Sequence, residues 1–305
     1  MSMNYDQWEA ACGVRSGPRH RLEANQAPEA TYFPLALVPY AAEVEKRWGR
    51  PVCQELLVHR LYEYLRFTEL LELKSINHVG TLIAFDELIV PMSRELRSQA
   101  FLLIRDEAHH ATGADDVAHQ IELATGVSRL PSAKPQFLHR LGAMREAQDK
   151  DLAPLIDVAF ATISETLISG SLAQIPKDPN VVSLVRGYTA DHARDEARHS
   201  SYFSEFFAKF WPQLPVAVRE QLGLLLPELS LAFLEPDYAS HQRVLEAIGL
   251  SATESRKLVQ QAYPAEQAAT AVRRPLQGTI RLFQRVGVFD DHRTHDAFAE
   301  RGLIG

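Results

Sequence analysis

The chain has 305 residues, 46% of them hydrophobic and 23% charged, which is typical of a globular protein with a sizeable core. Its formal net charge of −7 argues against nucleic acid or an anionic membrane surface as a partner. Two cysteines cannot build a disulfide framework, and neither a signal peptide nor a run of ~18 apolar residues is present. We therefore expect a cytoplasmic protein that binds neither nucleic acid nor membrane.

Helical patterns follow one another along most of the chain. Residues 1 to about 30 contain several Gly and Pro breakers and are expected to be irregular. Beyond them, apolar residues recur at helical spacing, with Pro at a first-turn position near residue 51 and Ser93 as a candidate N-cap. The main predicted helices span about residues 39–48, 51–76, 93–123, 136–151, 154–173, 180–211 and 268–287.

The patterns that are missing narrow the fold and the function. No run alternates polar and apolar residues as a strand does, and no repeat, low-complexity tract or linker divides the chain. We predict a single all-α domain over residues 1–305. Gly-rich phosphate loops, H-E-x-x-H and G-x-S-x-G are also absent, so nucleotide binding and serine-hydrolase chemistry have no support.

One motif, D-E-x-x-H, occurs twice. It spans Asp106 to His110 and Asp195 to His199, and no other histidine among the twelve has Glu three positions before it. Positions i and i+3 share one face of a helix, so each motif presents a carboxylate and an imidazole together. One copy is usually two polar neighbours on a surface helix. Two copies on separate helices are typical of a bundle that binds two metal ions through these residues and one further Glu from each of two other helices.

Glu165 is the candidate on the third helix. Its neighbours one turn away are apolar or small, and a bare carboxylate there would cost several kcal/mol or stay protonated. Metal ligation resolves this cost, whereas the alternative is a protonated Glu in the core. On the helix that starts near residue 51, Glu72 and Glu69 compete for the fourth position, and the residues alone do not decide between them.

Three further residues lie in the motifs or close to them in the sequence. His192 lies on the same helical stripe as Glu196 and His199 and is a candidate third imidazole, although a partly buried histidine is the plainer alternative. Asp106 and Asp195 are candidates to accept the second N–H of a ligating histidine. For each Asp the alternative is a solvated residue on the helix surface.

This pattern resembles the p-aminobenzoate N-oxygenase family of diiron proteins, which adds a third histidine to the commoner ligand set. Glu72 precedes Glu107 by 35 residues, and His192 follows Glu165 by 27. The helix predicted over residues 180–211 carries H-x-x-x-E-x-x-H. The resemblance favours Glu72 over Glu69 and covers a ligand-bearing bundle of about residues 50–211.

The resemblance implies a ferritin-like four-helix bundle with flanking helices, usually a homodimer, that binds two iron ions. It makes Glu107 and Glu165 the bridging ligands. The first iron would be bound by Glu72, Glu107, His110 and Glu165, and the second by Glu107, Glu165, His192, Glu196 and His199.

The implied activity is O2-dependent oxidation of an aromatic amine through hydroxylamine and nitroso to a nitro compound, in secondary-metabolite biosynthesis such as that of an antibiotic. No flavin or NAD motif is visible, so a reductase or a small reductant is expected to donate electrons. The substrate-binding residues cannot be identified from the sequence. Three alternatives remain: a diiron carbon hydroxylase or desaturase, a ferritin-like iron-binding protein without oxygenase activity, and a metal-free interaction bundle.

Overall fold

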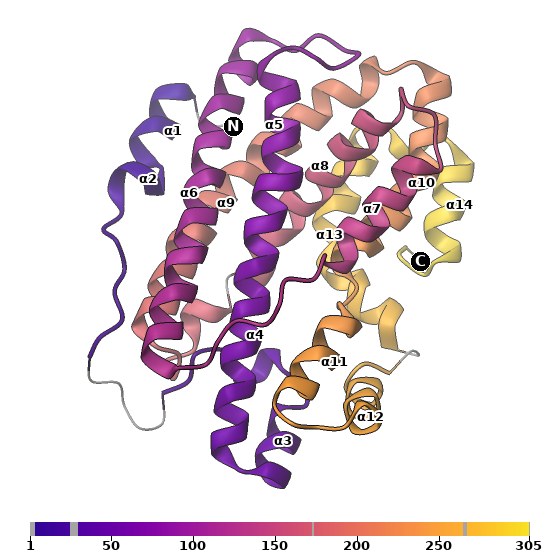
Figure 1. The fold of residues 1–305 in the computed structure, drawn as a ribbon. Helices are drawn as coiled ribbons and strands as arrows, with labels where there is room; N and C mark the ends of the chain where they lie inside the picture. Colours follow the sequence, from indigo (N-terminus) through magenta and orange to yellow (C-terminus); the bar gives the residue numbers. More distant parts are fainter. Residues whose placement is uncertain (1–3, 25–29, 173, 265–266, 305) are drawn as a thin grey trace.

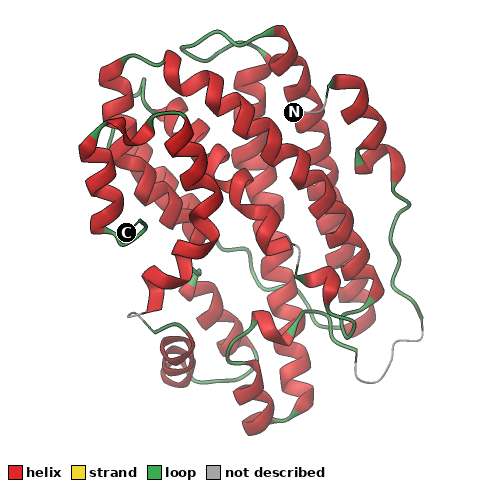
Figure 2. Ribbon diagram, turned by 180° about the vertical axis from the view of Figure 1, so that it is seen from behind, coloured by secondary structure: helices red, strands yellow, loops and turns green. Residues whose placement is uncertain are grey.

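The computed structural model describes residues 4–24, 30–172, 174–264 and 267–304, and the regular elements there are all helical (Figure 2). In these ranges the only extended pairing is one parallel bridge between Thr31 and Val181. None of the described helices is long and apolar enough to cross a membrane. The all-α prediction is confirmed.

Four long helical segments form the centre of the molecule (Figure 1). The first is interrupted by a π-helical turn, η2, which joins α4 to α5. α4 and α5 pack on α6, α6 packs on α9, and α9 packs on α8, which closes a four-helix bundle against η2 and α5. The first segment consists of α4 (Arg50–Leu71), η2 (Glu72–Ile76) and α5 (Asn77–Ala84). The other three are α6 (Arg94–Thr125), α8 (Ala153–Leu172) and α9 (Ser183–Phe210).

Shorter helices flank this bundle. α7, α10 and α13 pack on α8, α14 packs on α10, and α3 and α11 pack on the first half of α4. Short 3-10 turns lie at 35–37, 175–177, 211–213 and 288–290. The flanking helices are α3 (Ala41–Trp48), α7 (Gln136–Glu146), α10 (Val216–Leu234), α11 (Tyr238–Ala247), α12 (Ala252–Ala262), α13 (Ala268–Arg285) and α14 (His292–Glu300).

The helix predictions agree with the structure apart from their ends. Ser93 caps α6 as predicted, with its hydroxyl accepting the Leu96 N–H at 3.3 Å. The helix predicted to end near residue 76 continues to Ala84, because the π-helical turn carries the chain onward without a break. The predicted end of another helix at residue 173 lies outside the described residues.

The prediction of an irregular N-terminus is wrong in part. α1 (Tyr5–Ala11) and α2 (Gly13–Ser16) occupy this segment, although residues 1–3 and 25–29 lie outside the description. Asn4 and Gln7 form a reciprocal capping box at the start of α1, and Trp8 is buried against the bundle. Capping and one large buried side chain therefore stabilise helices that are too short to show a clear apolar period.

Candidate metal centre

The seven predicted ligands meet in the middle of the bundle. None of them is more than 3% exposed, although four carry carboxylates and three carry imidazoles. Their donor atoms form three overlapping groups in which all atoms lie within 4.8 Å of one another, and such groups could hold metal ions. The groups are Glu107, His110, Glu196 and His199; Glu72, His192 and Glu196; and Glu72, Glu107 and Glu165.

Glu107 joins the two D-E-x-x-H motifs. One of its carboxylate oxygens lies 2.8 Å from Nδ1 of His110 on its own helix, and the other lies 2.8 Å from Nδ1 of His199 on α9. Nδ1 of His199 also lies 3.2 Å from Glu196. Both motif histidines therefore direct the same ring nitrogen toward the shared carboxylates.

His192 belongs to the same cluster. Its Nε2 lies 3.1 Å from Glu196 and 3.5 Å from Glu72, and its ring centroid is 4.2 Å from that of His110. The ring is fully enclosed, and Nδ1 has no hydrogen-bond partner in the described part of the chain. The third imidazole is thus placed among the carboxylates and not at the edge of the bundle.

Glu72 and Glu165 would have the highest cost of burying a charge without a partner. Both are fully buried, and neither of the two oxygens of either side chain has a hydrogen-bond partner within the described ranges. No Lys or Arg described by the structure forms an ion pair with any of the four central carboxylates. Buried polar groups are rarely left without partners, so this donor set fits bound cations.

The π-helical turn distinguishes Glu72 from Glu69. A π turn inserts an extra residue into a helix and is found frequently at functional sites. Here the turn begins at Glu72, whose side chain lies inside the cluster. Glu69 remains on the regular helix, where its side chain is 15% exposed and pairs with Arg66 at 2.7 Å. The structure therefore brings Glu72, and not Glu69, to the other ligands.

Burial and mutual repulsion shift the protonation of the metal-free site. Burial, and then the charges of Glu107 and the other nearby carboxylates, raise the pKa of Glu72 well above its usual range, and burial together with Glu196 and Glu107 does the same for Glu165. Burial alone would lower the pKa of His199, but the charges of Glu107 and Glu196 raise it well above its usual value. Without metal, all three groups therefore hold their protons more tightly than they would in water.

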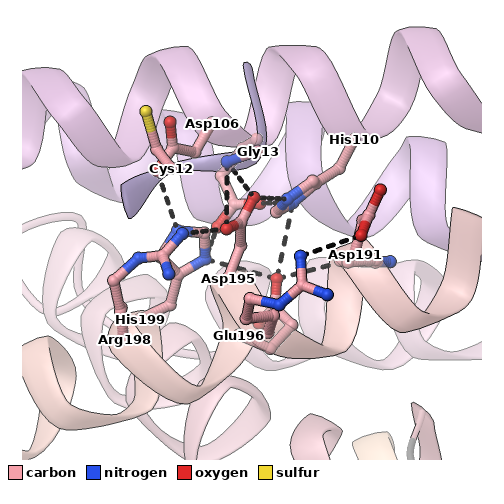
Figure 3. A network of polar contacts seen from close by, with 12 residues as sticks. Cys12, Gly13, Asp106, His110, Asp191, Asp195, Glu196, Arg198 and His199 are labelled. Carbon is pink, nitrogen blue, oxygen red and sulfur yellow. Dashed lines mark hydrogen bonds and ion pairs between the residues drawn. The ribbon is translucent and has the colours of Figure 1, made fainter. Parts of the chain in front are cut away.

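Asp106 and Asp195 lie outside the cluster, and each lies beside the histidine of the other motif. Oδ2 of Asp195 on α9 is 3.1 Å from Nε2 of His110 on α6, and Oδ2 of Asp106 on α6 is 3.6 Å from Nε2 of His199 on α9. Figure 3 shows Asp195 between His110 and Arg198. A carboxylate on Nε2–H leaves Nδ1 free as a metal donor. The hydrogen bond of Asp195 suits this predicted role, whereas Asp106 faces Nε2 of His199 beyond hydrogen-bond distance.

The N-terminal helices contribute contacts that the sequence did not reveal. The Trp8 indole donates a hydrogen bond of 2.8 Å to Asp106, and the backbone N–H of Gly13 donates to Asp195 at 3.1 Å. Side chains of Arg105 and Arg198 pair with the same two aspartates. The capping motif Asn4-x-x-Gln7 directly before a tryptophan was the available signal, because it marks a helix start next to a residue that prefers burial.

One cavity reaches the cluster, and a second is lined by a residue whose pKa responds to it. One of about 410 Å³ is lined by His110 and His192 and is bounded by N-terminal residues 13–20. The other, of about 490 Å³, has aromatic walls and is lined by Tyr64, a partly buried residue whose buried hydroxyl has no described partner. Burial, and then the charges of Glu72 and Glu196, raise the pKa of Tyr64.

Comparison with known proteins agrees with the pattern of the site. A family model described as p-aminobenzoate N-oxygenase AurF matches residues 24–287. No curated protein matches the chain. The match covers most of the chain and confirms the resemblance drawn from the motifs, together with the ferritin-like all-α fold that it implied.

Glu165→Leu distinguishes a metal centre from a metal-free bundle. In metal-free protein the change removes a buried carboxyl without partners, so we expect the free energy of unfolding to rise by about 1–3 kcal/mol. It should also abolish the increase in Tm that Fe(II) gives the wild type, measured anaerobically by calorimetry. An undiminished increase would show that Glu165 does not bind metal.

Glu72→Gln and Glu69→Gln form a matched pair three residues apart. We expect Glu72→Gln to weaken metal binding at least as much as the loss of an outer-shell partner does, by about 10–100-fold. Glu69→Gln should retain the wild-type affinity, because its side chain pairs with Arg66 away from the cluster. Metal analysis after equilibrium dialysis measures both, and the reverse order of effects would reassign the ligand.

Metal binding should release protons. The raised pKa values of Glu72, Glu165 and His199 favour their protonated forms in metal-free protein, whereas ligation needs them deprotonated. Apparent affinity should therefore rise with pH. Calorimetry in buffers of different ionisation enthalpy should detect this release of protons on metal binding. An affinity independent of pH would contradict these protonation states.

Proposed function

Since the chain belongs to the p-aminobenzoate N-oxygenase family, we propose that it is a diiron arylamine N-oxygenase. It would use O2 to oxidise an aromatic amine through hydroxylamine and nitroso to a nitro compound. The observation that supports this most is the buried set of four carboxylates and three histidines, whose orphaned oxygens need cations.

The donor set suits iron. Carboxylate and imidazole ligands favour iron or manganese over metals that prefer thiolates. Four carboxylates carry about four negative charges, which two divalent ions would neutralise. The first iron would be held by Glu72, Glu107, His110 and Glu165, and the second by Glu107, Glu165, His192, Glu196 and His199. When bound, iron would supply the redox chemistry with O2.

The side chains of the protein would exclude water from the metal centre and orient its imidazoles. Full burial of the ligands excludes solvent from the reacting centre. Asp195 would fix the tautomer of His110 by accepting from Nε2–H, which leaves Nδ1 toward the cluster. Asp106, 3.6 Å from Nε2 of His199, would attract the N–H of that ring in the same sense. The orientation of the two imidazoles would thus be set before any substrate arrives.

The larger of the two cavities, which Tyr64 lines, is the candidate binding site for the amine. Its volume of about 490 Å³ suits a small aromatic molecule. Phe33, Phe67 and Phe137 line it, and rings of this kind stack on planar ligands. Arg60 and Arg66 also line this cavity and could pair with an acidic substituent on the ring.

Electrons must come from outside the chain under this proposal. The sequence carries no flavin or NAD motif, so a reductase or a small reductant would return the iron to Fe(II) between rounds. We also propose, from the family, a cytoplasmic homodimer that acts in secondary-metabolite biosynthesis such as that of an antibiotic.

A single-turnover reaction tests this function. Protein loaded anaerobically with Fe(II) is mixed with isotope-labelled O2 and a panel of aryl and alkyl amines, and products are weighed by mass spectrometry. We expect label on the nitrogen of an aromatic amine, and no labelled product from Glu72→Gln treated in the same way. Label on carbon, or a desaturated product, would instead make the chain a carbon hydroxylase or desaturase.

Iron uptake and O2 consumption without any labelled product would contradict the N-oxygenase assignment. It would favour the ferritin-like iron-binding alternative. Size-exclusion chromatography then shows whether the chain forms the large assembly that iron storage requires.

A further inference from the structure

Residues 4–23 of the first described segment form an N-terminal arm that precedes the family match at residue 24. Its helices α1 and α2 lie along the outside of the bundle, where α1 contacts α6 and α2 contacts both α6 and α9 (Figure 1). These are the two helices that carry the D-E-x-x-H motifs. The arm therefore covers the histidine side of the metal centre with residues that precede the matched range.

Trp8 provides the first contact between the arm and the centre. The side chain is only 2% exposed, its Nε1 donates to Asp106 at 2.8 Å, and its ring lies 5.6 Å from that of His199. An indole N–H can only donate, so it occupies one oxygen of Asp106 while Arg105 occupies the other. Asp106 is thereby held as an acceptor beside Nε2 of His199.

Gly13 provides the second contact. Its backbone N–H donates to both oxygens of Asp195, at 3.1 and 3.2 Å, and Asp195 in turn lies 3.1 Å from Nε2 of His110 (Figure 3). A Cβ at this position would lie 2.7 Å from Oδ2 of Asp195, so only glycine allows the close approach. One arm thus reaches the outer carboxylates of both motifs.

The rest of the arm is anchored along the same face. His20 lies 2.7 Å from Asp191 on α9, and Arg19 pairs with Asp116 on α6. Gly187 leaves room for the His20 ring, because a Cβ there would lie 2.5 Å from Nδ1 of that ring. The arm also forms one wall of the cavity of about 410 Å³ that reaches His110 and His192.

We infer that the N-terminal arm is a positioning element of the metal centre. Trp8 and Gly13 fix Asp106 and Asp195, and these two carboxylates fix the imidazoles of His199 and His110. Because the arm acts through the aspartates, its loss would loosen the histidine ligands without removing any donor atom. The inference rests on the metal centre of the proposed function but is independent of the substrate.

Trp8→Phe tests the inference, because it keeps an aromatic ring and removes the N–H. The readout is the rate at which Fe(II)-loaded protein loses metal to a chelator under anaerobic conditions. Loss of an outer-shell partner costs about 10–100-fold in affinity, so we expect release to accelerate about 10-fold or more. A release rate equal to that of the wild type would overturn the inference.

Trp211→Phe is the matched control. Trp211 is also 2% exposed, and its Nε1 has no hydrogen-bond partner in the described chain. The same ring atoms are therefore removed from the core without a lost hydrogen bond to a carboxylate. We expect wild-type release from this variant, and equal acceleration in both variants would mean that Trp8 contributes packing alone.

Gly13→Ala gives an independent test on the other motif. Its Cβ would displace Asp195, so metal release should accelerate as it does in Trp8→Phe. Gly278→Ala is its control, because a Cβ there meets no atom within 4 Å. Unchanged release in Gly13→Ala would show that the contact with Asp195 does not position His110.

A double-mutant cycle identifies the path of the effect. If Trp8 acts through Asp106, Trp8→Phe combined with Asp106→Asn should release metal no faster than Asp106→Asn alone. Additive effects would overturn a path through Asp106. The release rates do not depend on any amine, so they stand even if the single-turnover reaction yields no nitrogen-labelled product.

Discussion

The placement of four carboxylates at the centre of one helical bundle is the constraint on which the rest of this structure depends. Each is fully buried, and no described Lys or Arg balances them, so in metal-free protein the cluster must take up protons. Two divalent cations would remove both the desolvation penalty and the repulsion. Folding alone gives no reason for such a cluster, whereas metal binding does.

The residues around the cluster are also arranged in a way that suits metal binding. Each D-E-x-x-H motif supplies a carboxylate and an imidazole inward and an aspartate outward, and each aspartate lies beside the histidine of the opposite helix. The crossed pairing ties α6 to α9 at the metal centre itself. The arm adds donors to both aspartates, so three segments far apart in the sequence converge on one pair of imidazoles.

The parts of this site that the sequence predicted are those determined by local spacing. Both motifs follow from i, i+3 geometry, and Glu165 is conspicuous because its helix is otherwise apolar. Glu72 and Glu69 could not be separated by spacing, since a π-helical turn leaves no clear mark in the sequence. Trp8 and Gly13 contact partners 98 and 182 residues away, and contacts of that range arise from tertiary packing that helical periodicity does not encode.

The most direct test of the metal centre is anomalous X-ray diffraction at the iron edge from crystals grown with Fe(II). The account predicts two iron peaks per chain inside the bundle, among the donor atoms of the seven buried residues. A single peak, or iron only at the protein surface, would contradict a two-metal centre built from these seven residues.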